Sequence, residues 1–157
     1  MDENYSGDSD MIDLPMMAVV TCCFREGLMQ EVYHDHLGNP TAGIGHLLTE
    51  QELNELRVGD KVTMKKVTEW FQEDMTKAYK AAKEQAAMLN IESSDFIAAL
   101  TSVNFQLGQS WYLKFTKTWH FLMSGDYKSA AREVQDSRWY RQTPLRVKDF
   151  QEAILSL

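Results

Sequence analysis

Glu26, Asp35 and Thr41 have the residue types that cleavage of a glycosidic bond requires. Such cleavage needs an acid that protonates the leaving oxygen and a carboxylate that stabilises charge or activates water. Glu26 precedes Gly27 at the expected end of a helix over 13–26, where the helix dipole and partial burial disfavour an ionised carboxyl. Asp35 follows beside a polar turn that favours the carboxylate, and the Thr41 hydroxyl can hold a water against it. Taken alone, a fraying helix end and an ordinary turn aspartate explain these residues better, because a chain with 23 acidic residues has many similar pairs.

Histidine and cysteine residues do not form a metal motif in this sequence. The chain contains four scattered histidines, namely His34, His36, His46 and His120. Cys22 and Cys23 are adjacent, so they cannot easily reach unstrained disulfide geometry, and we expect buried thiols in a reducing compartment. The sequence therefore predicts neither a metal nor another cofactor.

Composition indicates a globular protein with an acidic N-terminal tail. The chain has 157 residues, of which 44% are hydrophobic and 25% charged, and this balance suits one domain. Its net charge is -7, and five acidic residues with no Lys or Arg lie in the first fifteen positions. We therefore expect a flexible tail over 1–12 and no nucleic-acid binding. No apolar run approaches the roughly 20 residues that span a bilayer, so membrane insertion is not expected.

The order of sequence patterns predicts an α+β fold that is mostly helical. A hairpin is expected over 30–46, and Thr49 and Glu52 form a capping box that opens a helix to about Leu56. A short strand is expected over 58–62 and a long helix over 64–87. Caps and glycines then predict four more helices. They run over 95–107 after Ser94, over 111–123, over about 126–135 after Asp126, and over 144–157 after Thr143.

These elements suggest one domain over 13–157 that is built from two lobes. A small lobe over 26–63 carries the hairpin or short sheet. The long helix over 64–87 joins it to a helical lobe over 88–157, which also includes the first helix. Periodicity alone does not place the lobes relative to each other.

The segment over 25–48 resembles the active-site segment of the phage-type lysozymes, or endolysins. The pattern in that family is Glu-Gly, Tyr-x-Asp, Gly and Thr-x-Gly-x-Gly-His. This chain has the same elements in the same order and spacing: Glu26-Gly27, Tyr33-His34-Asp35, Gly38 and Thr41-Ala42-Gly43-Ile44-Gly45-His46. The runs over 104–108 and 137–144 are similar to the family in register, so the resemblance covers the chain from about Leu14 onward.

The resemblance implies a role for each matching residue. Glu26 would be the general acid, while Asp35 with Thr41 would position the attacking water, giving hydrolysis with inversion. The bond cut would be the β-1,4 link from N-acetylmuramic acid to N-acetylglucosamine in peptidoglycan, which leads to bacterial lysis. Residues at family positions that line the sugar cleft are Leu47, Phe105, Thr118 and Glu133, although Glu133 replaces an asparagine. His46 and Asp74 would form a structural ion pair.

The resemblance also implies how the protein would reach its substrate. An endolysin without an export signal would wait as a monomer in the host cytoplasm and reach the periplasmic peptidoglycan through a hole made by a holin. Two other interpretations stay open. One is a lytic transglycosylase that uses a glutamate alone, and the other is a non-catalytic virion or wall-binding protein that retains the fold.

Overall fold

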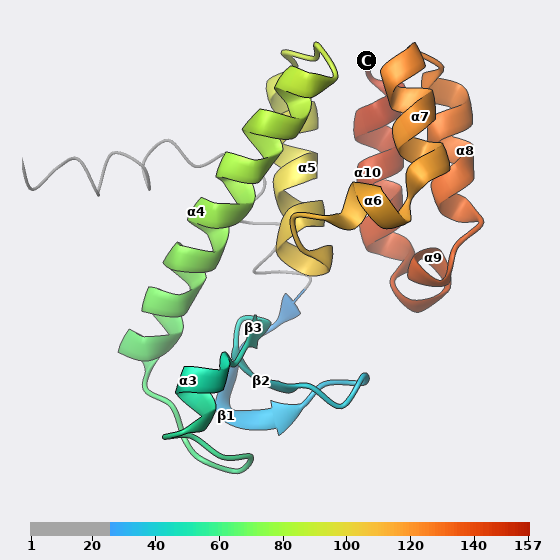
Figure 1. Ribbon diagram of the computed structural model, residues 1–157. Helices are drawn as coiled ribbons and strands as arrows, with labels where there is room; N and C mark the ends of the chain where they lie inside the picture. Colours follow the sequence, from blue (N-terminus) through green and yellow to red (C-terminus); the bar gives the residue numbers. More distant parts are fainter. Residues whose placement is uncertain (1–25) are drawn as a thin grey trace, which may run out of the picture.

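The computed structural model describes residues 26–157, which form a small antiparallel sheet and a larger set of helices (Figure 1). This arrangement confirms the predicted α+β, mostly helical fold class. Three predictions concern residues outside this range: the acidic tail, the helix before Glu26, and the thiols of Cys22 and Cys23.

The predicted hairpin is confirmed and gains a third strand. The strands are β1 (Met29–His34), β2 (Pro40–Gly43) and β3 (His46–Leu47), in the order β1-β2-β3. Pairing is antiparallel, so that Tyr33 faces Thr41 across β1 and β2, and Thr41 faces Leu47 across β2 and β3. Thr41 therefore occupies the middle strand of the sheet.

The strand predicted over 58–62 is wrong. In the described chain this segment makes one isolated bridge, between Lys61 and Glu31. The reason is a turn over 57–60 that occupies the first part of this segment, in which the Asp60 amide donates to the Arg57 carbonyl and the Asp60 carboxylate accepts from the Arg57 amide. The backbone therefore becomes extended only at its last residues.

The capping box opens α3 (Glu50–Leu53) as predicted, although the helix ends earlier than Leu56. The Thr49 hydroxyl accepts from the Glu52 amide at 3.1 Å, and the Glu52 carboxylate accepts from the Thr49 amide at 2.8 Å. These bonds satisfy two amides that a helix start leaves without partners.

The long helix α4 (Met64–Met88) matches the prediction to within one residue and runs from the sheet into the helical part (Figure 1). Near its start, Val67 and Trp70 pack with buried Val32 and Ala42 of the sheet. Near its end, Ala82 and Ala86 belong to the core of the helical part. One helix thus supports both hydrophobic clusters.

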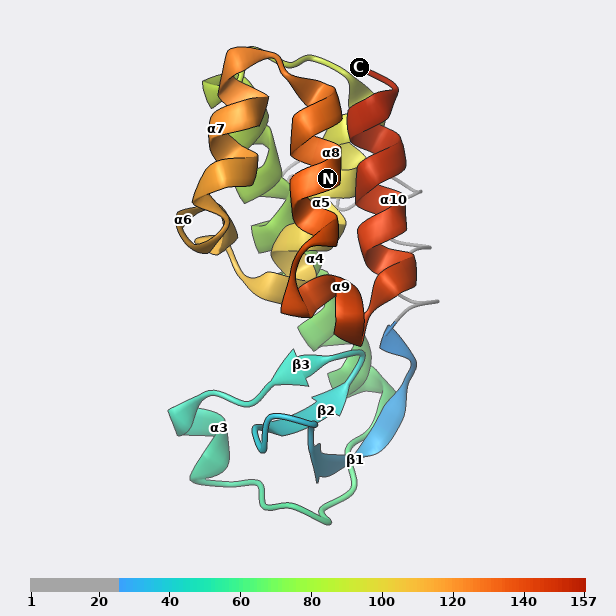
Figure 2. The ribbon, with the colours of Figure 1, turned by 90° about the vertical axis from the view of Figure 1, so that its right-hand side faces the viewer.

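The remaining helices lie together above the sheet in Figure 2. They are α5 (Ser94–Leu107), α6 (Trp111–Lys114), α7 (Thr116–Ser124), α8 (Tyr127–Gln135), α9 (Arg138–Gln142) and α10 (Pro144–Leu155). Trp111 lies at the centre of their core, with its ring 5.6 Å from that of Phe150. Among the described helices, none is both long enough and apolar enough to cross a membrane.

Several predicted helix ends need correction. The cap of α5 is Ser93, one residue before the predicted Ser94, because the Ser93 hydroxyl accepts from the Phe96 amide. The helix predicted over 111–123 is two helices, since Phe115 leaves the helical conformation and packs its ring against Trp139. Asp126 caps α8 as predicted.

The last two helices also differ from the expectation. The short helix α9 begins after a Ser137 cap and was not among the predicted helices. Thr143 does not cap α10 with its side chain, because its hydroxyl instead donates to the Trp139 carbonyl at 3.1 Å. α10 starts at Pro144 as expected and ends at Leu155, two residues before the expected end.

Candidate active site

Glu26 lies where the helical backbone ends and the chain turns toward β1. Its side chain is only partly buried, and Gly27 follows with a φ of 75°. Gly45, in the turn between β2 and β3, passes so close that a Cβ at this position would lie 2.7 Å from Glu26 Oε1. Gly45 also has a φ of 65°, which disfavours other residues. The sheet therefore contacts the predicted acid through its backbone.

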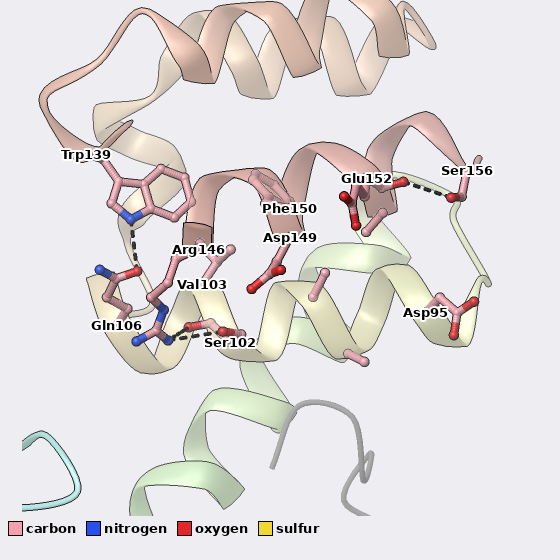
Figure 3. Close-up of a pocket in the computed structure, with 13 residues that line it drawn as sticks. Asp95, Ser102, Val103, Gln106, Trp139, Arg146, Asp149, Phe150, Glu152 and Ser156 are labelled. Atoms are coloured by element: carbon pink, nitrogen blue, oxygen red, sulfur yellow. Dashed lines mark hydrogen bonds between the residues drawn. The ribbon is translucent and has the colours of Figure 1, made fainter. Parts of the chain in front are cut away.

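The Glu26 carboxylate has a cationic partner that the sequence analysis missed. Nη1 of Arg146 donates a hydrogen bond to Glu26 Oε2. Nη2 of the same guanidinium donates to the carbonyl of Ser102 at 3.1 Å and to its hydroxyl at 3.0 Å (Figure 3). One guanidinium therefore connects the Glu26 carboxylate to α5 and α10.

A signal for Arg146 was present in the sequence. Arg146, Phe150 and Ile154 recur every four residues on α10, and all three are buried. A cation on the apolar face of a helix must find a partner inside the protein. A search for charged residues within apolar stripes therefore finds this arginine without a structure.

The carboxylate of Asp35 is held by the turn between β1 and β2. Oδ1 of Asp35 accepts from the Leu37 amide at 2.9 Å and from the Asn39 amide at 2.8 Å. Burial alone would raise the pKa of Asp35, but these hydrogen bonds to the charged form outweigh it and lower the pKa below 3.8. The turn thus favours a carboxylate at this position, in agreement with the expected polar setting.

Thr41 is connected to Asp35 through the backbone of Asn39. The Thr41 hydroxyl donates to the Asn39 carbonyl at 2.9 Å, while the Asn39 amide donates to Asp35. The Asp35 amide also donates to the Asn39 carbonyl at 2.9 Å. Since its hydrogen is used in this way, the Thr41 oxygen is left as a hydrogen-bond acceptor.

Tyr33 lies within electrostatic reach of both predicted catalytic carboxylates. Burial raises its pKa most, and the charges of Glu26 and then Asp35 raise it further. On the sheet Tyr33 pairs with Thr41. Tyr33 is therefore influenced by the charges of Glu26 and Asp35 and has Thr41 as its strand partner.

The predicted sugar-binding residues occupy several parts of the surface. Leu47 is exposed on β3, opposite Thr41. Phe105 on α5 is partly buried and packs edge-on against Phe71, with ring centroids 5.6 Å apart. Thr118 and Glu133 line one surface pocket of about 400 Å³.

The Thr118 hydroxyl has an unusual environment for a buried polar group. The residue is 1% exposed, and within residues 26–157 its oxygen is the buried side-chain polar atom that has no hydrogen-bond partner. Buried hydroxyls normally find a partner because an unsatisfied one is destabilising. Thr118 is also one of the residues that line the pocket beside α7 and α8.

His46 lies between two carboxylates rather than the one that was predicted. Its Nδ1 is 2.7 Å from Asp74 Oδ2, and its Nε2 is 2.8 Å from Glu52 Oε1. Burial alone would lower the pKa of His46, but both carboxylates raise it, and the net shift is upward. His46 therefore favours the imidazolium form, which can donate from both ring nitrogens at once.

A metal site does not emerge from these acidic and histidine residues. Over residues 26–157, no three side chains of His, Cys, Asp or Glu gather in a way that could hold an ion.

Comparison with known proteins gives a family that agrees with this arrangement. The phage lysozyme family matches residues 24–149, which include Glu26, Asp35, Thr41 and Arg146. This match covers more than half of the chain, so the protein belongs to the phage lysozyme family.

Individual relatives of this chain differ in kind and in length. The chain is 29% identical to the pre-baseplate central spike protein Gp5 of Enterobacteria phage T4, over 92% of this chain and 28% of that protein. It is 28% identical to the peptidoglycan hydrolase gp36 of Pseudomonas phage phiKMV, over 80% of this chain and 14% of that protein. It is also 30% identical to the probable T4-type lysozyme 1 of Dictyostelium discoideum, over 78% of this chain and 84% of that protein. The chain therefore spans less than a third of the first two relatives.

Proposed function

We propose that this protein is a muramidase that hydrolyses the β-1,4 bond between N-acetylmuramic acid and N-acetylglucosamine in bacterial peptidoglycan. Glu26 is the general acid, and Asp35 with Thr41 holds the attacking water. The observation that supports the proposal is that Asn39 links Asp35 to Thr41 by hydrogen bonds, beside Tyr33, on which the charges of both Glu26 and Asp35 act, in a chain of the phage lysozyme family. The names of two relatives, a peptidoglycan hydrolase and a probable T4-type lysozyme, support the substrate class.

The chemistry assigns one step to each residue. Protonated Glu26 gives its proton to the glycosidic oxygen as the bond to the anomeric carbon breaks. A water donates one hydrogen bond to the Thr41 oxygen and another to the Asp35 carboxylate, which takes its proton as the water attacks. Attack from the face opposite to the leaving group inverts the anomeric carbon and needs carboxyls about 6.5–9.5 Å apart.

The glycan strand is proposed to bind at Leu47, Phe105, Thr118 and Glu133. The unsatisfied Thr118 oxygen supports this assignment most directly, because a sugar or peptide group would complete its hydrogen bonding. The exposed Leu47 and the partly buried Phe105 offer apolar surface to the flat faces of sugar rings. Glu133 brings a negative charge to the same pocket as Thr118.

The proposal is tested on purified peptidoglycan with the wild type beside Glu26→Gln. Counting reducing ends and weighing the products should show hydrated muramic ends from the wild type and no release from the variant. Products lighter by one water would instead identify a lytic transglycosylase. If neither protein releases fragments while both are folded and bind the wall, the fold serves a non-catalytic role.

Two settings for the activity follow from the relatives. In the first, the enzyme accumulates as a monomer in the host cytoplasm and reaches the periplasm through a holin, which causes lysis from within. The second is a wall-degrading part of the virion, which is favoured by the likeness to a baseplate spike protein and by the small share of the two phage relatives that the chain covers. Immunoblots of purified virions distinguish the settings, because only the second predicts the protein in the particle.

A further inference from the structure

The guanidinium of Arg146 connects three separate parts of the chain. Arg146 belongs to the first turn of α10, Ser102 belongs to α5, and Glu26 lies just before β1. We infer that Arg146 is a positioning residue for the catalytic acid: held by Ser102, it fixes the Glu26 carboxyl and stabilises the charge that this group acquires. The inference rests on the proposed muramidase function.

The place of Arg146 in its helix argues against a role in folding alone. The first turn of a helix carries the positive end of the dipole, so a cation there is destabilising. The side chain of Arg146 is also only 6% exposed, and a buried ion pair is often no more stabilising than apolar residues of similar size. An apolar residue like its neighbours Val147 and Phe150 would serve packing better.

The geometry of the contacts restrains the guanidinium plane. One terminal nitrogen contacts Glu26, while the other donates both to the Ser102 carbonyl and to its hydroxyl. Because the guanidinium is rigid and planar, fixing one nitrogen on α5 also fixes the direction of the other. A lysine at the same position has a single nitrogen and cannot span both partners.

The helices on which this contact depends are themselves held together. Trp139 Nε1 donates to Gln106 Oε1 at 2.9 Å (Figure 3). Gln106 Nε2 in turn donates to the Thr143 hydroxyl at 3.2 Å. Gln106 belongs to α5, whereas Thr143 directly precedes α10. The distance between Ser102 and the start of α10 is therefore set by hydrogen bonds outside the catalytic residues.

The charge of Arg146 acts on the reaction through Glu26. When Glu26 gives its proton to the leaving oxygen, its carboxyl becomes negative beside the guanidinium. Only interactions that strengthen as the transition state forms increase kcat, and this one does, because the charge on Glu26 grows during the transfer. Substrate binding does not require Arg146, so KM should change little.

The experiment measures kcat and KM on soluble peptidoglycan fragments for matched variants. Arg146→Met should lower kcat by about 100-fold with KM within about twofold, since misplacing a catalytic group by about 1 Å has effects of this size. Arg146→Lys retains the charge, so its kcat should be about tenfold higher than that of Arg146→Met. Ser102→Ala should have a kcat about threefold lower than that of the wild type. The control is Lys148→Met, which removes an exposed charge from the same helix and should stay within about twofold of the wild type.

The outcomes separate this inference from the proposed function. An inactive wild type contradicts the muramidase proposal itself. An active wild type with an unchanged kcat in folded Arg146→Met overturns the role of Arg146, and so does an equal loss in Lys148→Met. If Arg146→Met does not fold, Ser102→Ala decides: a lower kcat with an unchanged melting temperature supports positioning, and an unchanged kcat overturns it.

Discussion

The indole Nε1 of Trp70 donates a 2.6 Å hydrogen bond to Oε2 of Glu52. The other carboxylate oxygen of Glu52 accepts from the Thr49 amide and lies 2.8 Å from Nε2 of His46. The His46 ring stacks on Trp70, with centroids 4.4 Å apart. One carboxylate thus joins the start of α3, strand β3 and helix α4 beside the strand that carries Thr41.

Replacing Glu52 by alanine should lower the free energy of unfolding by about 2–3 kcal/mol, because a capping bond and two bonds to neighbouring elements are lost together. Glu50→Ala, on the same helix and exposed, should change it by less than about 0.5 kcal/mol. Urea unfolding of both variants measures the difference. Equal effects would mean that the contacts of Glu52 do not stabilise the small sheet.

His46→Gln should destabilise the protein in a pH-dependent manner. The pKa of His46 is raised from 6.5 in the folded state, so its contribution is complete below about pH 6.5 and is lost as the pH rises through the higher folded value. Burial alone would raise the pKa of Glu52, but its hydrogen bonds to Thr49 and His46 lower it below 4.5. Its contribution is therefore present above that value and lost as the pH falls. The stabilisation should be greatest between these limits.

Urea unfolding at about pH 5.5, 7.5 and 9.5 tests this dependence. We expect a loss of about 2 kcal/mol for His46→Gln at the lowest pH and a smaller loss at the highest, since hydrogen bonds to charged groups have this strength. His120→Gln, at an exposed histidine of α7, is the matched control and should show no such trend. A loss for His46→Gln that is constant over the three values would contradict an imidazolium between Asp74 and Glu52.

Gly45→Ala should reduce activity more than it reduces stability. The backbone at Gly45 has a φ of 65°, and an added Cβ would lie 2.7 Å from Glu26 Oε1, so the acid has to move. Gly125→Ala is the matched control, because its φ of 77° imposes similar strain but nothing lies within 4 Å of the added Cβ. Both variants should lose about 1–2 kcal/mol of unfolding free energy. Only Gly45→Ala should lose about 10–100-fold in kcat, and equal activity in the two variants would contradict a steric effect on Glu26.

The sequence predicted best the elements whose signals are local. Thr49 and Glu52 marked a helix start through their spacing alone, and the stripe of α4 placed its ends to within one residue. Errors arose where distant residues decide the backbone. Phe115 interrupts a helical pattern because its ring packs against Trp139, and no local signal records that contact.

In the candidate site, too, features with a local sequence signal were predicted, whereas contacts between distant residues were not. The order of Glu26, Asp35 and Thr41 along the chain was sufficient to propose an acid and a water-binding pair. The contact from Arg146 joins residues 120 positions apart, and that from Glu52 to Trp70 crosses two elements, so neither follows from spacing. Periodicity does show that Arg146 lies on a buried face, but its partner depends on how α10 packs against α5.

Activity should persist into the acidic range because the base stays ionised there. Although burial acts in the opposite direction, the amides of Asn39 and Leu37 lower the pKa of Asp35 below 3.8. If Asp35 activates the water, the acidic limb of kcat/KM should therefore fall below about pH 4, provided that the protein is still folded. Initial rates on soluble peptidoglycan fragments, with circular dichroism at each pH, measure this limb. Asp35→Asn should lose at least about 100-fold throughout. A limb near about pH 6 in folded protein would mean that a group other than Asp35 limits the reaction.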